Sequence, residues 1–533
     1  MPGPPAARLP RLPIGRGAAP LSARRAVHPY GWAQPYGSGV EPRLRALCDL
    51  SVAESREYAG RHEYDGRLQD LSPAGVTAAL GRLGRQAGEA LADGHDEAHL
   101  TAFEEGARVA YGELALHRAL PGLHVANLDL ACYDRAYAPE PERARARAQH
   151  LAGWPDAVDA ALEALDRVPR EVALGTLASV RGLAEGVEDE QALAAHARLV
   201  AHVERASREG EADPALGAPA LARLMGVPEG LEVDLGRLAE QADRERDRLT
   251  ALLGDACERI APGVPVAETR LALERDHPDA DGVLREARAL TEEVVAWVAA
   301  SGLVPYPDGE CRVGPAPGSR SSTMASLSWA APGEPEGPSW YYVTPPDPTW
   351  PEQDQQEWLG VFSRATLPAV TLHEVAPGHF THGRALRHVA SPVRRTLFSS
   401  AFVEGWAHYA EEMALEEGFR EGDPHVQAGV AVEALIRVTR LACALGVHTG
   451  AMTVAEAAAR FTADTGTHGS AALSEARRAT WDPTYGRYTW GKLEILRWRE
   501  RALARPGSTL AGFHRDLLAL GAPPLGLLGA VLD

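Results

Sequence analysis

Cysteine is scarce in this chain of 533 residues. The five cysteines are odd in number, lie far apart in the sequence and form no CxxC pair. Such a set argues against a disulfide framework and against a zinc site made of thiolates, and it fits a reducing compartment. Long apolar runs are also missing, since no segment approaches the roughly 18 consecutive apolar residues that cross a bilayer. We therefore expect no membrane partner.

An excess of positive charge is absent as well. The chain has 54 basic and 73 acidic residues and a net charge of −19, which disfavours nucleic acid as a partner. Residues 1–30 are rich in proline and arginine but have no apolar core. They predict a disordered tail rather than a secretion signal. Together these features predict a cytoplasmic location.

Lysine occurs only once, as Lys492, among the 54 basic residues. The abundance of arginine and alanine indicates a strong coding bias, so a position that keeps lysine against it suggests a specific role. A single surface lysine that survived by chance explains the observation equally well.

Helical periodicity dominates what is present. Apolar residues recur at steps of three and four, as at Leu235, Leu238, Ala242 and Leu249, while alternating runs rich in valine and isoleucine are scarce. No repeat of fixed period is visible, which argues against a solenoid. The predicted fold class is mainly α.

The composition changes between about residues 301 and 352. Stretches rich in proline and glycine flank two short segments, "MASLSWA" and "SWYYVTPP", that have the character of strands. We predict a small sheet at about residues 320–345, with Tyr341 and Tyr342 contacting a peptide that pairs with an open strand edge. A surface hairpin without a ligand is an equally good interpretation.

The segment "TLHEVAPGHF", residues 371–380, resembles a two-histidine zinc motif with an unusual spacing. Residues of an α-helix turn by about 100° each, so His373 and His379, six positions apart, would differ by about 240° and could not face one ion. Pro377 removes a backbone donor, and Gly378 tolerates unusual dihedral angles. A bulge or kink of two residues would restore the facing that a spacing of four gives.

The chemistry of zinc suggests roles for the neighbouring residues. A catalytic zinc ion commonly has three protein ligands, and a carboxylate beside the first histidine, here Glu374, can serve as general base. Glu404 lies 25 residues after His379 in a helix-like, aromatic segment, and we predict it as the third ligand. Glu411 shares its helix face and is predicted to bond a zinc-bound histidine. A glutamate on a helix is otherwise usually a solvated surface residue.

Five segments, in this order and spacing, resemble the bacterial family of domain of unknown function 885 over roughly residues 340–530. The family is regarded as similar to gluzincin-type helical zinc metallopeptidases, including thimet-like oligopeptidases and thermostable carboxypeptidases. The resemblance implies a large two-lobed helical fold with the small sheet beside an active-site cleft. The segments are "HEVAPGHF", "FVEGWAHYAEE", "RLACALGVH", "YTWGKLEILRWR" and "FHRDLLALGAPPL".

The resemblance also implies site residues. It gives His373, His379 and Glu404 as ligands of a Zn²⁺ cofactor and Glu374 as general base, and it places His448, Tyr488 and Lys492 near the cleft. The Tyr488 hydroxyl could donate to an oxyanion, although a packed core tyrosine remains an alternative.

Other assignments are more open. His448 could be a catalytic donor or a satisfied buried histidine, and Arg497 or Arg487 could pair with a substrate carboxylate. The family commonly has an Asp-Thr pair where this chain has "AL" at 444–445, so an orienting carboxylate for His448 is missing. His382 is a minor rival metal ligand.

We therefore predict a zinc-dependent hydrolase that cleaves short peptides, with a zinc hydrolase of other amides or esters and a non-catalytic zinc-binding scaffold as alternatives. Structural zinc sites usually have four ligands and no retained base, which speaks against the scaffold. The predicted organisation is a tail at 1–30, an N-terminal helical lobe at 31–300 and a catalytic lobe at 301–533, whose motif helices span 355–415 and C-terminal helices 425–533.

Overall fold

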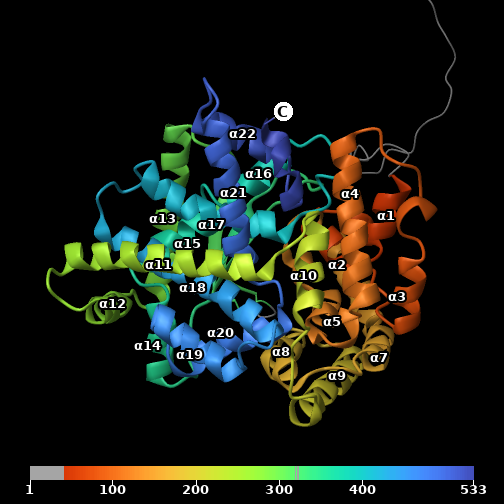
Figure 1. The fold of residues 1–533 in the computed structure, drawn as a ribbon. Coiled ribbons are helices and arrows are strands. Elements are labelled where there is room, and N and C mark those ends of the chain that lie inside the picture. The colour runs from red at the N-terminus through yellow and green to blue at the C-terminus, as the bar shows by residue number, and fades with distance from the viewer. Residues whose placement is uncertain (1–40, 318–319, 321–322, 533) are drawn as a thin grey trace, which may run out of the picture. The chain divides into compact units, whose positions relative to one another are not determined.

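The computed structural model describes residues 41–317, 320 and 323–532, and the predicted tail at 1–30 lies outside them. The described chain forms 22 α-helices and one three-stranded sheet, so the prediction of a mainly α fold is confirmed (Figure 1). Among these helices, none combines the length and the apolar character that a bilayer crossing needs.

Ten helices precede residue 230. α7 and α9 pack on each other over a core that includes Trp154, Val158, Leu199 and Val203. The helices are α1 (Pro42–Cys48), α2 (Val52–Glu57), α3 (Pro73–Leu80), α4 (Gly94–Ala107), α5 (Pro121–Leu128), α6 (Glu140–Ala152), α7 (Trp154–Ala164), α8 (Arg170–Gly182), α9 (Glu190–Glu209) and α10 (Ala218–Gly226).

Twelve further helices follow. Several of the 22 helices begin at an aspartate whose side chain accepts a hydrogen bond from a backbone N–H of the first turn, which is the usual N-cap interaction. These caps are Asp93, Asp189, Asp234, Asp279 and Asp423. The helices are α11 (Leu235–Ile260), α12 (Val266–Arg275), α13 (Ala280–Ser301), α14 (Glu352–Gly360), α15 (Thr366–Glu374), α16 (His379–Leu386), α17 (Ser400–Glu416), α18 (Pro424–His448), α19 (Val454–Thr465), α20 (Gly469–Trp481), α21 (Arg487–Leu503) and α22 (Leu510–Ala519).

The largest hydrophobic core lies among the later helices. α11 packs along α18, and α17 packs along α21. Leu249 of α11, Val294 of α13, Leu372 of α15, Trp406 of α17 and Val438 of α18 are all buried in this one cluster. Because α11 and α13 share a core with helices beyond residue 301, this core is not divided at the predicted lobe boundary.

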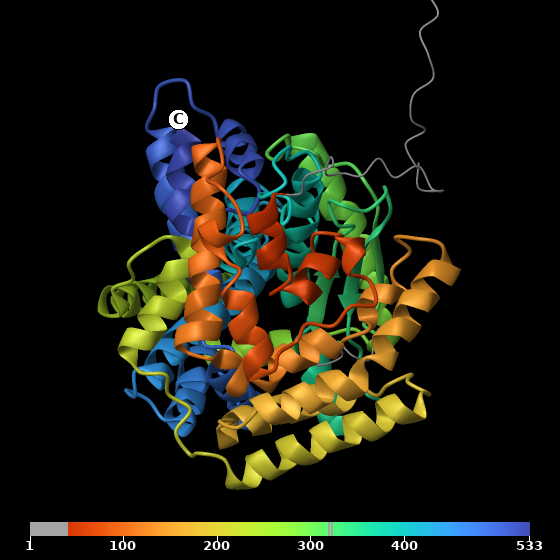
Figure 2. The same ribbon diagram turned by 90° about the vertical axis from the view of Figure 1, so that its right-hand side faces the viewer.

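The sheet has the strand order β1–β3–β2, with β1 (Cys311–Pro315) parallel and β2 (Ala325–Ser328) antiparallel to the central β3 (Ser339–Val343) (Figure 2). The predicted range of about 320–345 includes β2 and β3 but misses β1, which lies in a stretch whose proline and glycine content suggested irregular structure. Tyr341 pairs with Val313 on one side and with Leu327 on the other. Both edges of β3 are therefore occupied, so a peptide cannot pair with the strand that carries Tyr341 and Tyr342, and the outer strands of the sheet are β1 and β2.

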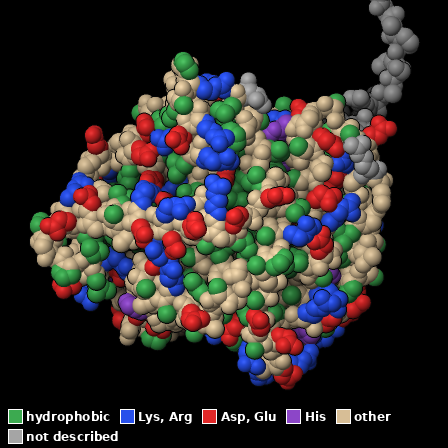
Figure 3. Space-filling model, in the orientation of Figure 1, with side chains coloured by type: hydrophobic (Ala, Val, Ile, Leu, Met, Phe, Trp, Pro, Cys, Tyr) green, Lys and Arg blue, Asp and Glu red, His purple; other side chains and the backbone are tan. Residues whose placement is uncertain are grey.

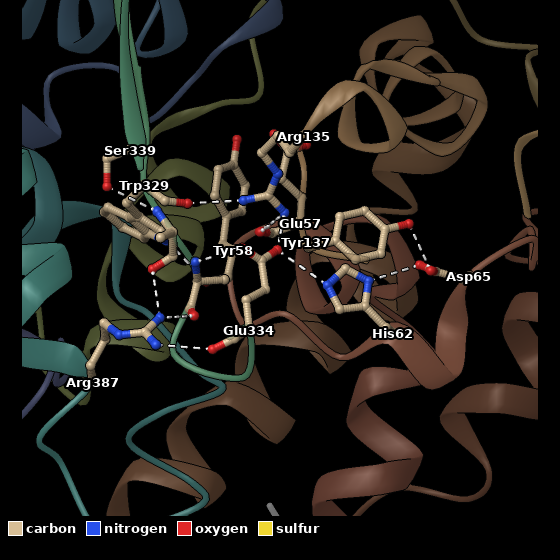
Figure 4. Close-up of polar contacts among 12 residues, drawn as sticks. Glu57, Tyr58, His62, Asp65, Arg135, Tyr137, Trp329, Glu334, Ser339 and Arg387 are labelled. Carbon is tan, nitrogen blue, oxygen red and sulfur yellow. Dashed lines mark hydrogen bonds and ion pairs between the residues drawn. The ribbon is translucent and has the colours of Figure 1, made fainter. Parts of the chain in front are cut away.

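A buried polar network connects the N-terminal helices to the segment between β2 and β3 (Figure 4). The Glu334 carboxylate accepts from Arg135 at 2.5 Å and lies 3.1 Å from His62 Nε2. Arg135 also donates to the carbonyl oxygen of Trp329 at 2.9 Å, and Arg387 donates to the carbonyl oxygen of Glu334 at 2.9 Å. Residues far apart in the sequence thus hold this connection, and with it the sheet, in place.

Charged side chains cover much of the molecular surface. On the face shown in Figure 3, acidic and basic groups are interspersed. Many form ion pairs, such as Arg246 with Asp243 and Asp247 on α11 and Arg420 with Glu293. Exposed pairs of this kind contribute about 0–1 kcal/mol each, so the stability of the fold rests on its cores.

Candidate metal centre

The helix that carries the HEVAPGHF motif is broken, as predicted. α15 ends at Glu374, and α16 begins at His379. Pro377 has no N–H to continue the helical pattern, and the Ala376–Pro377 peptide is cis. The backbone N–H of Gly378 instead bonds to the carbonyl oxygen of Leu372 at 3.1 Å. The interruption is a turn of residues 375–378, longer than the expected kink of two residues.

Close contacts fix this turn. A Cβ atom at Gly378 would lie 1.8 Å from the carbonyl oxygen of His373, so only glycine fits there. The carbonyl oxygen of Pro377 accepts a hydrogen bond from Trp406 Nε1 at 2.9 Å and another from the Thr381 hydroxyl. The turn is therefore anchored to α17, the helix that carries Glu404.

The structure brings His373, His379 and Glu404 together. The two imidazole rings are 4.7 Å apart and nearly perpendicular, with an angle of 86°. Glu404 Oε2 lies 3.5 Å from His373 Nε2 and 3.4 Å from His379 Nε2. One potential ligand atom from each of the three residues lies within 4.8 Å of the other two. These three residues, here called the triad, converge as the motif spacing predicted.

The triad fits a zinc ion by two criteria. Two imidazole nitrogens and one carboxylate oxygen are a donor set of catalytic zinc sites, with a position left open for substrate or water. Glu404 Oε2 is buried and has no hydrogen-bond partner among the described residues, and an unpaired buried oxygen of this kind requires an explanation. Burial raises the pKa of Glu404, but the two histidines lower it more, so its pKa stays well below the ordinary value.

A buried ion-pair network orients His373. Its Nδ1–H donates to Glu411 Oε1 at 2.6 Å, which leaves Nε2 free to face Glu404. Arg437 Nη1 lies 3.3 Å from Glu411 and 3.2 Å from Glu433. The sequence analysis proposed Glu411 but missed Arg437 and Glu433. Glu433 and Arg437 lie four residues apart in an otherwise apolar helix, and this spacing could have indicated a buried ion pair.

Glu374 lies directly beside the triad in sequence. Its side chain is buried, and its carboxylate makes no hydrogen bond with any residue that the structure describes. Burial raises its pKa, while His373 and His379 lower it by a smaller amount. Burial also raises the pKa of the Tyr341 hydroxyl on β3, and the Glu374 charge raises it further.

Tyr488 reaches the triad because two helices touch at their backbones. A Cβ atom at Gly491 would lie 1.9 Å from the carbonyl oxygen of Ala401, and one at Gly405 would lie 2.5 Å from Gly491. This contact of α17 and α21 places the Tyr488 ring 6.2 Å from the His373 ring, in a stacked orientation of 28°.

A family model described as "Bacterial protein of unknown function (DUF885)" matches residues 54–532 of the chain. The chain belongs to this family. None of the curated proteins matches the sequence.

Two solved structures have the same fold as this DUF885 protein. One is a candidate lipoprotein of unknown function from Shewanella oneidensis, with 20% sequence identity, a TM-score of 0.70, and coverage of 91% of this chain and 97% of that one. The other is a candidate lipoprotein from Colwellia psychrerythraea, with 18% identity, a TM-score of 0.72, and coverage of 92% and 97%. At these identities the likeness concerns the fold alone.

Two basic residues predicted to contact substrate have other partners in this DUF885 protein. Lys492 is buried, and its ammonium group donates to Glu412 at 2.7 Å and to Glu245 at 3.0 Å. The single lysine of the chain therefore joins α21 to α17 and α11. Arg497 lies on an exposed side of α21, where it bonds to Glu494.

His448 and His382 also lie outside the triad. His448 Nε2 is 2.7 Å from the carbonyl oxygen of Ala479, and its Nδ1 accepts from the backbone N–H of Leu216 at 3.3 Å. Both ring nitrogens thus have hydrogen-bond partners, which agrees with the alternative that His448 is a buried histidine whose hydrogen bonds are satisfied. His382 Nε2 is 3.1 Å from the carbonyl oxygen of Gly521.

Tyr342 does not share the surroundings of Tyr341. Side chains alternate between the faces of a strand, and Tyr342 stacks on Trp340 with ring centres 5.9 Å apart, on the face of β3 opposite Tyr341. Of the two tyrosines predicted to contact a peptide, Tyr341 lies in the hydrophobic core that contains Leu372 and Val375, and Tyr342 does not.

Proposed function

We propose that this DUF885 protein is a zinc-dependent hydrolase that cleaves peptide bonds of short peptides. The observation that carries the proposal is the convergence of the triad, with a buried Glu404 oxygen that lacks a partner, beside the unbonded carboxylate of Glu374. Three ligands with an adjacent free carboxylate are typical of catalytic rather than structural zinc sites, which argues against a scaffold role. The proposal includes a cleft at the zinc site in a two-lobed, gluzincin-like fold, which would admit oligopeptides and exclude folded proteins.

Zinc held by His373, His379 and Glu404 would supply a Lewis acid for a substrate carbonyl and would acidify water. Glu374 takes the proton from the attacking water and returns it to the leaving amine, a role that its raised pKa favours. Tyr488 donates its hydroxyl hydrogen to the developing oxyanion. Glu411 keeps His373 in the tautomer whose Nε2 can act as a ligand.

The test uses the purified full chain, metal analysis, and digestion of a peptide library read by mass spectrometry. We expect stoichiometric zinc in the wild type and in Glu374→Gln, with cleavage lost only in Glu374→Gln. The control is Glu416→Gln. It makes the same chemical change at the end of α17, where Glu416 forms a surface ion pair with Arg499 of α21. Unchanged turnover in Glu374→Gln would refute the mechanism, and a chain that binds no zinc would refute the function.

A panel of amides and esters, run beside the peptides, separates the peptidase from a hydrolase of other substrates. The same triad and base can attack either kind of carbonyl, so substrate preference has to be measured. Cleavage of the panel compounds without cleavage of any peptide would support the second function.

We also propose a cytoplasmic location, which is supported by five cysteines that form no disulfide. The two solved structures with the same fold are described as candidate lipoproteins, so a membrane-attached location is the alternative to test for this chain. Fractionation of cells that express the full-length protein decides between the two locations for this chain.

A further inference from the structure

Three arginines pack against Tyr488 and the nearby Tyr485. The guanidinium of Arg440, from α18, lies 5.5 Å from the centre of the Tyr488 ring, and that of Arg487, from α21, lies 5.7 Å from it. Arg440 also lies 5.9 Å from the Tyr485 ring, against which Arg478 of α20 packs at 5.4 Å. Two arginines thus lie beside Tyr488, and the third lies against the neighbouring Tyr485.

Two of these arginines have full carboxylate partners. Arg440 binds Glu475 through two hydrogen bonds of 2.9 and 2.7 Å. Arg487 binds Asp482 through two hydrogen bonds of 2.6 and 2.8 Å. Both pairs have the bidentate geometry that guanidinium and carboxylate groups favour.

Arg478 lacks such a partner. Among the described residues its only polar side-chain contact is at 3.5 Å to Asp482, whose oxygens already bind Arg487. Its Nε is buried without a hydrogen-bond partner, while a quarter of the side chain remains exposed. Of these three arginines, Arg478 is therefore the one without a bidentate carboxylate partner among the described residues.

The surroundings hold Arg478 in place for a ligand. Its guanidinium packs against the rings of Trp481 at 5.8 Å and Tyr485 at 5.4 Å, contacts that restrict its position. Arg487 connects this group to the triad. Its guanidinium lies 5.7 Å from the centre of the Tyr488 ring, and that ring lies 6.2 Å from the His373 ring. A negative group bound by Arg478 and Arg487 would thus lie near the triad.

We infer that Arg478, supported by Arg487, binds the free α-carboxylate of the substrate, so that the hydrolase acts on peptides near their carboxyl terminus. This inference rests on the proposed function. A carboxylate would supply the charged, bidentate acceptor that Arg478 lacks, whereas a terminal amide would offer only one neutral carbonyl oxygen.

The experiment compares two matched libraries of N-acetylated tripeptides, one with free carboxylates and one with carboxyl-terminal amides. We expect the wild-type protein to prefer the free acids. Arg478→Gln should lower kcat/KM for the acids by about 10- to 100-fold, the effect of one charge-assisted interaction, and leave the amides within about twofold. Arg478→Lys keeps the positive charge but not the two parallel N–H donors of the guanidinium, so its kcat/KM for the acids should be intermediate.

Arg477→Gln is the matched control, because Arg477 is the next residue on α20 and pairs with Glu171 instead. It should leave the preference unchanged. Equal cleavage of acids and amides by the wild type would overturn the inference. So would equal losses on both libraries in an Arg478→Gln protein that keeps its wild-type melting curve.

A binding measurement separates failure of this inference from failure of the proposed function. In the Glu374→Gln background, calorimetry with the acid and amide libraries reports recognition without turnover. If the wild type cleaves neither library but acids still bind more tightly than amides through Arg478, the hydrolase function is wrong and the carboxylate site stands. If acids and amides bind equally, the carboxylate site is wrong whatever the enzyme cleaves.

Discussion

Gly378→Ala tests whether the turn between the two histidines sets the geometry of the centre. The added Cβ would lie 1.8 Å from the carbonyl oxygen of His373, whereas real Cβ atoms essentially never approach closer than 3.0 Å. The two atoms must therefore separate by about 1.2 Å, the difference of these distances, while zinc ligands tolerate deviations of about 0.2 Å. We expect zinc affinity to fall by at least about tenfold, and the free energy of unfolding by about 1–3 kcal/mol.

Zinc affinity would be measured by competition with a chromophoric chelator, and stability by urea unfolding of the metal-free protein. Gly254→Ala on α11 is the control, because a Cβ at Gly254 meets no atom within 4 Å. The same substitution there should leave zinc binding unchanged and raise stability by about 0.5–1 kcal/mol. A Gly378→Ala protein with wild-type zinc affinity would show that the turn does not position the histidines.

Three further predictions follow from buried contacts. Glu411→Gln weakens the acceptor that orients His373, so zinc affinity should fall about 10- to 100-fold in the chelator assay, whereas Glu416→Gln on the same helix should bind normally. Gly491→Ala would place a Cβ 1.9 Å from a carbonyl oxygen of α17 and should destabilise the protein by about 1–3 kcal/mol in urea, so a wild-type midpoint would contradict the backbone contact. Burial raises the pKa of Glu229 to about 7. The folded protein keeps this proton to higher pH than the unfolded chain does, so the free energy of unfolding should fall by up to about 3 kcal/mol as pH rises from 4.5 through 7. Glu229→Gln should remove this contribution to the pH dependence of urea unfolding, and an unchanged profile would assign it to other groups.

The facing of His373 and His379 was predictable because its determinants are local. Pro377 and Gly378 act on the backbone within one turn, so their effect on His373 and His379 follows from elementary helix geometry. The aromatic and acidic pattern around Glu404 indicated a buried carboxylate without knowledge of the fold.

The partners of Lys492 and the contacts of Arg437 depend on how distant helices meet. Lys492 was singled out by its rarity, but its partners Glu245 and Glu412 come from α11 and α17, which the sequence cannot place. Arg437 contacts Glu411 only because α18 packs beside α17. Spacing along one helix indicates which residues share a face, but it does not indicate what that face contacts.

The fold class was predictable for a local reason as well. Helical periodicity reports a local backbone preference, and it indicated the correct, mainly α class. β1 was missed because Cys311–Pro315 is a strand only through parallel pairing with β3, which lies more than twenty residues later. The main core continues across residue 300 because α11 and α13 pack against later helices.

Backbone contacts, more than side-chain preferences, determine the geometry of the triad. A Cβ at Gly429 of α18 would lie 1.8 Å from the carbonyl oxygen of Ala365, at the start of α15, and α17 meets α21 at Gly405 and Gly491. Main-chain atoms cannot relieve such contacts by rotating, as a side chain can. The helices that carry the histidines, the glutamate and Tyr488 are therefore held by packing with each other and with the turn at Gly378. The arrangement of the triad is therefore fixed by the protein itself, in contrast to small domains that fold only around a zinc ion.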